Sequence, residues 1–191
     1  MKKVGILAVQ GDYEAHGRML ERLGVEYSLI RKPEDLAGVG GVILPGGEST
    51  TQLKVMKEEG LAEALRKLAA DGGAFFGTCA GVILLAREVS NPEQESLDLA
   101  DLKVVRNGYG RQLDSHVTPG ACKLSPAPVE MVFIRAPVIA AVGPGVEVLA
   151  EVAGRPVLVQ QGRVLAATFH PELTSDTTIH EHFLSLVSNG R

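Results

Sequence analysis

A cysteine between two glycines is the residue of this chain best placed to do chemistry. Cys79 lies in the segment 75–83, which reads F-F-G-T-C-A-G-V-I. A turn from a strand into a helix strains its central residue, and flanking glycines let neighbouring backbone approach it. The sulfur then stands at a helix N-terminus, where the dipole and free N–H groups favour the thiolate. The pattern predicts a nucleophile elbow that carries cysteine, with the N–H of Ala80 as an oxyanion donor.

A lone cysteine is more often a small buried core residue than a nucleophile, and this alternative applies to both cysteines of the chain. The glycine-flanked turn favours the nucleophile for Cys79. Cys122 has no such setting in the segment 120–123, and we interpret it as core filler or a loop residue. Two cysteines are too few for a disulfide framework and lack a zinc-ligand spacing. We therefore expect no metal and no cofactor.

A thiol nucleophile needs a base, and the base needs a partner that orients it. His170, Pro171 and Glu172 follow the apolar run 165–169. Proline biases the residue before it towards an extended backbone, in which residues i and i+2 face the same side. Glu172 can then bind one ring nitrogen of His170 while the other faces the thiol. By itself a His-Pro-Glu sequence is also an ordinary surface turn.

Four other histidines compete for the role of base. His16, His180 and His182 fall in predicted helices, where exposed histidines are ordinary, and His116 falls in a predicted loop as a weaker candidate. His180 and His182 are two residues apart and do not share a helix face, so we expect no metal-binding pair.

A second glycine turn, L-P-G-G-E-S-T at positions 44–50, also joins a predicted strand to a predicted helix. It matches neither the phosphate-loop nor the dinucleotide-binding pattern. A double glycine at a strand end exposes N–H groups that suit a developing oxyanion. A tight turn with a helix cap is an equally good interpretation of this segment by itself.

The first half of the chain alternates short apolar runs with amphipathic stretches. This order indicates a parallel sheet with helices on both faces, and the carboxyl ends of such strands gather at one edge. The cysteine turn and His170 can therefore meet. We predict strands at 4–9, 25–30, 42–44 and 74–76, and helices at about 12–23, 49–56, 61–70 and 80–85.

The second half is richer in strands separated by glycine and proline turns. A polar surface loop is expected at 90–100. Residues 1–191 are predicted to form one α/β domain. The remaining predicted elements are strands at 102–105, 129–134, 146–152, 157–159 and 164–169, and a closing helix at 176–188.

Composition excludes several classes of protein. The 191 residues are 45% hydrophobic and 22% charged, with a net charge of −4 and no basic stripe, so we expect no nucleic-acid partner. No stretch approaches the roughly 20 apolar residues that span a bilayer, so we expect no membrane partner. The short apolar run after Lys3 is better read as a buried strand than as an export signal. A cytoplasmic enzyme is the expectation.

These motifs together resemble class I glutamine amidotransferases, and within them the branch that serves pyridoxal 5′-phosphate synthase. The resemblance covers nearly the whole chain, and the combination is far more specific than any single motif. It rests on the segments 8–11 (AVQG), 45–50 (PGGEST), 77–81 (GTCAG), 106–107 (RN), 110–112 (GRQ), 132–137 (VFIRAP) and 168–173 (TFHPEL).

The resemblance implies a flavodoxin-like three-layer domain with a mostly parallel central sheet. It also implies that Cys79 is the nucleophile, His170 the base and Glu172 its partner, with Gly47 and Ala80 as oxyanion donors. The implied L-glutamine pocket is lined by Gly47, Glu48, Ser49, Arg106, Ile134 and Arg135. Arginine suits the α-carboxylate of a free amino acid because it donates two parallel hydrogen bonds.

The implied partner is a (β/α)8-barrel synthase subunit that receives the ammonia in a hetero-oligomer, and its docking is expected to complete the oxyanion hole. The sequence departs from the family pattern at Tyr109, at Ser115-His116-Val117 and at Gln160. These departures concern local loops or partner contacts rather than the catalytic set. Arg135 as a surface charge and Ile134 as a core residue are the alternatives for those two positions.

Two other functions remain open from the residues. A cysteine peptidase or γ-glutamyl hydrolase would keep the chemistry and change the substrate, although Arg106 and Arg135 favour a free amino acid. A non-catalytic α/β binding module would retain the turn without the reaction. Reaction of Cys79 with a glutamine-like electrophile separates this last function from the enzymes.

Overall fold

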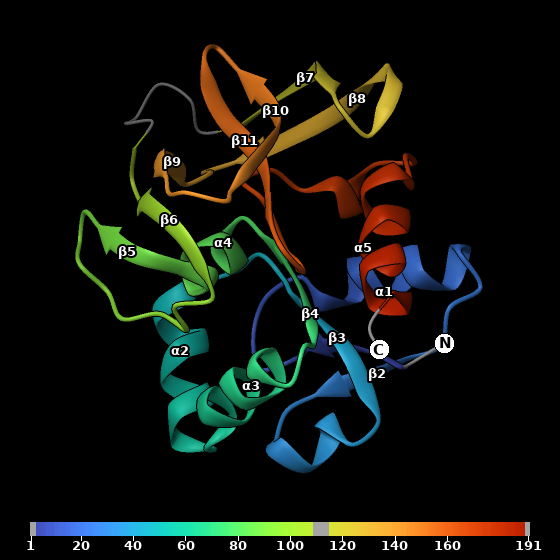
Figure 1. Ribbon diagram of the computed structural model, residues 1–191, viewed down its shortest axis with the longest axis vertical. Helices are drawn as coiled ribbons and strands as arrows, with labels where there is room; N and C mark the ends of the chain where they lie inside the picture. Colours follow the sequence, from blue (N-terminus) through green and yellow to red (C-terminus); the bar gives the residue numbers. More distant parts are fainter. Residues whose placement is uncertain (1–2, 109–114, 190–191) are drawn as a thin grey trace.

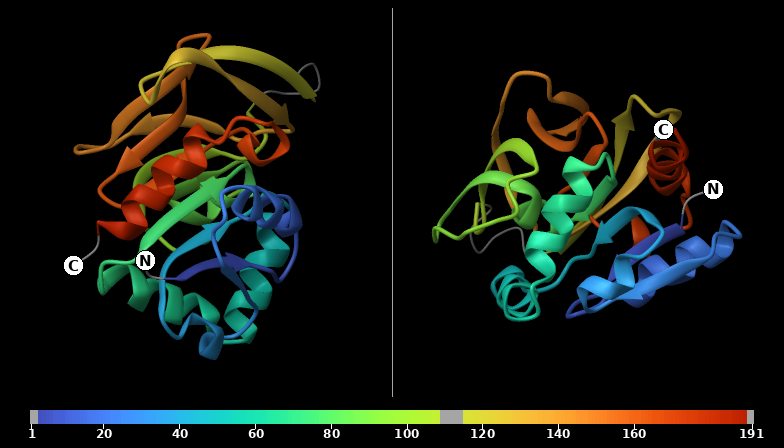
Figure 2. Two further views of the ribbon diagram at one scale, coloured as in Figure 1. Left: turned by 90° about the vertical axis from the view of Figure 1, so that its right-hand side faces the viewer. Right: turned by 60° about the horizontal axis from the view of Figure 1, so that its bottom comes forward.

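The computed structural model describes residues 3–108 and 115–189. Within these ranges a nine-stranded sheet carries helices on both faces, and a three-stranded sheet lies beside it (Figures 1 and 2). The fold is the α/β arrangement predicted from the sequence, with a parallel part followed by strand-rich additions. Among these residues, no helix combines the length and apolarity needed to span a membrane.

The parallel part of the large sheet is built mainly from the first half of the chain. Its strands lie in the order β2-β1-β3-β4-β12, and each neighbouring pair is parallel. Only β12 comes from the second half, so a distant segment is placed beside β4. The bounds are β1 (Lys3–Leu7), β2 (Tyr27–Ile30), β3 (Val39–Leu44), β4 (Ala74–Thr78) and β12 (Val164–Ala167).

The sheet continues beyond β12 as antiparallel strands in the order β11-β10-β7-β8, and the small sheet has the order β5-β6-β9. Both extensions come from the second half of the chain, apart from β5, as Figure 1 shows. The bounds are β5 (Ala86–Ser90), β6 (Ala100–Val105), β7 (Ser115–Cys122), β8 (Ser125–Ile134), β9 (Val138–Val142), β10 (Glu147–Val152) and β11 (Arg155–Gln161).

Each face of the parallel part buries its own hydrophobic cluster. Phe75 and Phe76 are neighbours in β4, and their side chains enter opposite clusters because successive strand residues alternate. One face packs against α2 (Ser49–Glu58), α3 (Leu61–Ala70) and α4 (Ala80–Leu85). The other packs against α1 (Tyr13–Arg22) and α5 (Thr178–Ser188), which lie on the same side in Figure 1.

The predicted strands and helices are present, with bounds that shift by a few residues, and three strands were missed. β5 follows α4 directly, without the glycine or proline that usually marks a helix end. β7 contains Pro119 and Gly120 and has only one buried residue, so its sequence is typical of a loop. β9 is short, between Pro137 and Gly143. His116 therefore lies in a strand, and its prediction as a loop residue was wrong.

Neighbouring strands β3, β4 and β12 end at one level. Leu44 of β3 pairs with Gly77 of β4, and Ala167 of β12 pairs with Thr78. The glycine loop, the cysteine turn and the histidine segment start directly after these positions. The parallel register therefore brings all three motifs to one edge of the sheet.

Phe183 anchors α5 to the sheet face that carries the histidine segment. Its side chain is fully buried and its ring centroid lies 5.6 Å from that of Phe76. We expect Phe183→Ala to lower the free energy of unfolding by about 3–5 kcal/mol, because it leaves a cavity in the core. Ser185→Ala, on the exposed side of the same helix, changes it by less than about 0.5 kcal/mol. Chemical denaturation measures both, and equal effects would contradict this packing.

Candidate active site

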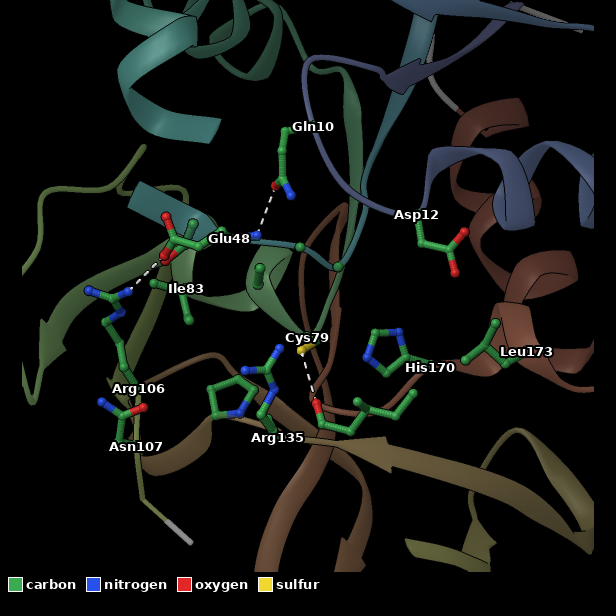
Figure 3. Close-up of a pocket in the computed structure, with 16 residues that line it drawn as sticks. Gln10, Asp12, Glu48, Cys79, Ile83, Arg106, Asn107, Arg135, His170 and Leu173 are labelled. Atoms are coloured by element: carbon green, nitrogen blue, oxygen red, sulfur yellow. Dashed lines mark hydrogen bonds and ion pairs between the residues drawn. The ribbon is translucent and has the colours of Figure 1, made fainter. Parts of the chain in front are cut away.

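A pocket of about 420 Å³ opens where β3, β4 and β12 end (Figure 3). It brings together residues that lie far apart in the sequence. Of the ten predicted site residues only Glu172 is absent from its lining, because it lies behind His170. The nine that line it are Gly47, Glu48, Ser49, Cys79, Ala80, Arg106, Ile134, Arg135 and His170.

Cys79 occupies the strained turn that its sequence predicts. Its φ of 48° and ψ of −106° are unusual for a residue with a side chain, and such strain costs on the order of 1–3 kcal/mol. Its N–H donates to Ala167 O at 2.9 Å, which ties the turn to β12. The Sγ atom lies 3.7 Å from Ile134 O, at the pocket floor drawn in Figure 3.

The glycines around Cys79 are required by close backbone contacts. A Cβ at Gly81 would lie 2.0 Å from Leu44 O of the neighbouring strand. A Cβ at Gly77 would lie 2.7 Å from the backbone of Gly81. The turn can therefore fold against β3 only when both positions lack a side chain.

His170 and Glu172 form a close pair at the end of β12. His170 Nδ1 lies 2.7 Å from Glu172 Oε1, and the His170 N–H donates to Val132 O at 2.8 Å. The predicted contact is present, but its predicted cause was wrong: residues 171–173 form a short 3-10 helix, η3 (Pro171–Leu173), rather than an extended segment. The tight turn folds Glu172 back beneath the ring.

Burial and charge act in opposite directions on this pair. Burial lowers the pKa of His170, but interactions with Cys79 and with Glu172 outweigh it and raise this pKa to about 10. Burial raises the pKa of Glu172, but His16 and His170 outweigh it and the net shift is downward. The pair therefore favours an imidazolium beside a carboxylate. An imidazolium at His170 can supply a proton to a leaving group in the pocket.

Gly46 leaves the space in which the His170 ring approaches Cys79. A Cβ there would lie 2.5 Å from His170 Cε1 and 3.4 Å from Cys79 Cβ. Its carbonyl accepts from the Asp12 N–H at 3.1 Å, which fixes the orientation of the Gly46–Gly47 peptide. Gly47 has a φ of 153°, and a Cβ there would lie 2.9 Å from Gly11 Cα. The double glycine therefore shapes the pocket wall, beyond its role as a turn.

Glu48 places a negative charge at the glycine loop. Its carboxylate caps α2 by accepting from Thr50 and Thr51. Partial burial raises its pKa, but these hydrogen bonds outweigh it and lower the pKa to about 2. Arg106 Nη2 lies 3.1 Å from Glu48 Oε1, and the Glu48 N–H donates to Gln10 Oε1 at 2.8 Å (Figure 3). The pocket thus holds both signs of charge.

Comparison with known proteins decides the family. The model of the SNO glutamine amidotransferase family matches residues 6–189. The chain belongs to this family. Two relatives carry the name pyridoxal 5′-phosphate synthase subunit PdxT. The one from Koribacter versatilis is 54% identical over 98% of this chain and 97% of its own. The one from Deinococcus radiodurans is 52% identical over 96% of each chain.

Solved structures agree with this amidotransferase fold. A crystal structure of a glutamine amidotransferase matches with a TM-score of 0.92 and 47% identity, covering 97% of this chain and 98% of that one. Another glutamine amidotransferase, from Thermotoga maritima, matches with a TM-score of 0.63, covering 98% of this chain and 94% of that one. At 12% identity, this second likeness shows the fold alone.

The other histidines of this amidotransferase do not all lie where the sequence predicts. His16 and His180 are fully buried, and their prediction as ordinary exposed helix residues was wrong. His16 Nδ1 and His180 Nε2 lie 3.0 Å apart, so each buried ring has a hydrogen-bond partner from the other helix. His116 stacks on Phe133 with ring centroids 4.7 Å apart, and it does not line the pocket. Within the described ranges, no three or more histidine, cysteine, aspartate or glutamate side chains gather in a way that could hold a metal ion.

Several further predictions concern the rim of the amidotransferase pocket and its surroundings. Ile134 is 37% exposed and lines the pocket, so the alternative of a core residue is wrong. Cys122 is buried in β7, which confirms it as core filler. Gln160 Oε1 accepts a hydrogen bond from His182 Nε2 at 2.6 Å, away from the pocket. Tyr109 and the segment 110–112 lie outside the described residues.

Sequence reasoning missed several lining residues of this site. Gln10 and Asp12 follow β1, and Leu173 ends η3. Gln10 belongs to the segment 8–11 that carries the family resemblance, yet polarity alone did not mark it as a site residue. The signal that could have found these residues is position, because each follows a strand at the same sheet edge.

We expect Gly46→Ala to disable the site, because its Cβ displaces the His170 ring. A displacement of about 1 Å lowers kcat on the order of 100-fold, while the circular dichroism spectrum stays unchanged. Gly120→Ala is the control, since its Cβ meets mainly the flexible end of Met131 outside the pocket. A glutaminase assay measures both variants. Full activity of Gly46→Ala would contradict the tight packing of His170 and Cys79 around Gly46.

Proposed function

We propose that this chain hydrolyses L-glutamine to L-glutamate and ammonia through a thioester on Cys79. The observation that carries the proposal is the convergence of Cys79 and the His170–Glu172 pair at neighbouring strand ends. Membership of the SNO glutamine amidotransferase family supports the amide substrate. Residues 1–191 act in this proposal as one glutaminase domain.

The charges of the pocket suit a free amino acid. Arg106 and Arg135 bind the α-carboxylate, while Glu48 binds the α-ammonium group and Ser49 lines the same wall. Arg106 and Glu48 already form an ion pair at 3.1 Å. A zwitterionic amino acid can enter this pair, with its α-carboxylate on Arg106 and its α-ammonium group on Glu48. Arg135 has a φ of 43° at the end of β8, and Figure 3 shows its side chain pointing towards Cys79. Ile134 contributes apolar contact to the substrate chain.

The Cys79 thiolate attacks the carboxamide carbon, and a tetrahedral intermediate forms. The N–H groups of Gly47 and Ala80 stabilise its oxyanion. His170 gives its proton to the nitrogen as the C–N bond breaks, so that ammonia leaves and a glutamyl thioester remains. His170 then takes a proton from water, which attacks the thioester and releases glutamate and the thiol. Glu172 keeps the His170 ring oriented in both steps.

The ammonia passes to a synthase subunit that makes pyridoxal 5′-phosphate. The names of the PdxT relatives support this partner, since each is a subunit of that synthase. We propose a (β/α)8-barrel partner in a hetero-oligomer located in the cytoplasm, in line with the family resemblance. Leu173 and Ile134, both exposed at the pocket rim, offer apolar area to a docking surface.

A cysteine peptidase or γ-glutamyl hydrolase is the rival that keeps the chemistry. We expect turnover of free glutamine and none of peptides. Glu48 and Arg106 would bind the free α-ammonium and α-carboxylate groups, and peptide bonds at the α-carbon remove these charges. Comparison of free glutamine with γ-glutamyl and ordinary peptides distinguishes the two. A non-catalytic binding module is the other rival, and it predicts no covalent adduct on Cys79.

We expect Cys79→Ala to lower glutamine hydrolysis on the order of 10⁴-fold or more, because no thioester can form. Cys122→Ala is the matched control, and it keeps activity because Cys122 is buried away from the pocket. A diazoketone analogue of glutamine labels Cys79 in the parent, which mass spectrometry detects. Substantial hydrolysis by Cys79→Ala would refute the assignment of the nucleophile.

We expect the glutaminase rate of the isolated chain to rise at least about 10-fold when the synthase subunit is added, because docking completes the oxyanion hole. The measurement is glutamate release at saturating glutamine, with and without the co-purified partner. Cys79→Ala in the same mixture gives the background rate. Equal rates with and without the partner would contradict activation by docking and leave the hydrolysis mechanism intact.

A further inference from the structure

A chain of buried polar groups runs from the back of the molecule to Glu172, and the proposed reaction does not use it. His180 Nε2 of α5 lies 3.0 Å from His16 Nδ1 of α1. His16 Nε2 lies 3.1 Å from Thr78 Oγ1, at the end of β4. Thr78 Oγ1 lies 3.5 Å from Glu172 Oε1, and His16 Nε2 itself lies 3.6 Å from that oxygen. The side chains of His180, His16 and Thr78 are fully buried.

The surroundings of the two histidines are apolar, which makes their presence costly without hydrogen bonds. The Phe76 ring centroid lies 6.0 Å from that of His16 and 5.3 Å from that of His180. Leucine or phenylalanine at either position would continue the hydrophobic cluster of this face. The two rings are instead supplied by different helices and meet only in the folded chain.

The hydrogen bonds can run in only one satisfactory direction. If every donor points towards Glu172, His180 Nε2–H donates to His16, His16 Nε2–H donates to Thr78, and the Thr78 hydroxyl donates to the carboxylate. The buried atom then left without a partner is the acceptor His180 Nδ1. In the opposite direction, His180 Nδ1 carries a buried N–H without an acceptor. The Thr78 hydroxyl then donates to His16 and no longer to the Glu172 carboxylate. An unpaired buried N–H is rarer than an unpaired acceptor, so the first direction holds.

We propose that His16 is a positioning residue for the glutaminase reaction proposed above: through Thr78 it holds Glu172 as an oriented carboxylate, and His180 fixes the tautomer of His16. Glu172 Oε1 then receives hydrogen bonds from two sides, from His170 Nδ1 at 2.7 Å and from Thr78. Neither His16 nor His180 lines the pocket. Their effect on the reaction passes through Glu172 to His170.

The groups that face Glu172 are His170, His16 and, through His16, His180; Asp12 acts on His16 from the start of α1. Burial lowers the pKa of His16 and lowers that of His180 to about 3, so both rings are neutral donors at neutral pH. Donors to a carboxylate lower its pKa. Removal of the His16 donor therefore raises the pKa of Glu172, and the carboxylate is lost at a higher pH.

The test compares His16→Leu, which removes the donor, with His16→Gln, whose amide N–H can replace Nε2–H. For His16→Leu we expect kcat to fall about 10- to 100-fold with KM changed less than about twofold, because the loss lies behind the pocket. The acidic limb of the pH profile of kcat/KM moves upward by about one pH unit. His16→Gln recovers most of both losses.

A second variant guards against a folding defect. His16→Leu/His180→Leu replaces both rings with apolar groups, so no buried N–H is left unpaired, and it shows the same shift of the acidic limb. His182→Gln is the matched control. His182 lies on α5 with His180, but it is only partly buried and binds Gln160 instead of His16, Thr78 or Glu172. Its kcat and pH profile match those of the parent.

Alkylation of Cys79 by iodoacetamide gives a readout that needs no substrate. Peptide mass spectrometry separates Cys79 from Cys122, and the rate of Cys79 alkylation at one fixed pH is lower in His16→Leu than in the parent. If the parent shows this faster alkylation but hydrolyses no glutamine, the proposed function is refuted and the role of His16 is not. Folded His16→Leu with an unmoved acidic limb and an unchanged alkylation rate would overturn the proposal, whatever its kcat. An equal shift in His182→Gln would overturn it as well.

Discussion

The parallel pairing of β4 with β12 is the constraint on which the active site depends. Ala167 pairs with Thr78, and the Cys79 N–H donates to Ala167 O at 2.9 Å. Cys79 and the His170 segment therefore leave the sheet side by side, although they lie far apart in the chain. β3 pairs on the other side of β4 and brings the glycine loop to the same edge. A shift of register at either pairing would separate residues whose chemistry requires contact.

Close backbone approach makes this edge work as a site. Gly81 admits Leu44 O, and Gly46 admits the His170 ring, at positions where any Cβ would collide. The strained backbone of Cys79 persists because β12 accepts its N–H and because β4 ends and α4 begins at the residues on either side of it. Stability supplied by two hydrophobic clusters, one on each sheet face, thus maintains a geometry that local energetics disfavour.

Electrostatics then separate two environments on the two sides of His170. In front lies an open pocket with Glu48 and Arg106 as paired charges, suited to a zwitterionic substrate. Behind lies a closed, apolar region in which Thr78 and His16 lie close to Glu172, and His180 binds His16. A carboxylate kept ionised in such a place needs donors from the protein, because water does not reach it. The proposed role of His16 follows from that requirement.

The sequence by itself determined the elbow at Cys79 and the parallel sheet of the first strands, because these depend on local turn chemistry and periodicity. It also indicated the contact between His170 and Glu172, although the 3-10 turn that makes this contact was not predicted. It did not place His16 and His180, since a histidine on a predicted helix is expected to face solvent unless a partner from another element satisfies it. It also missed β7, whose proline and polar residues pair only because β8 and β10 lie beside it. Tertiary structure decided these features, because burial of a polar group depends on contacts that no local pattern encodes.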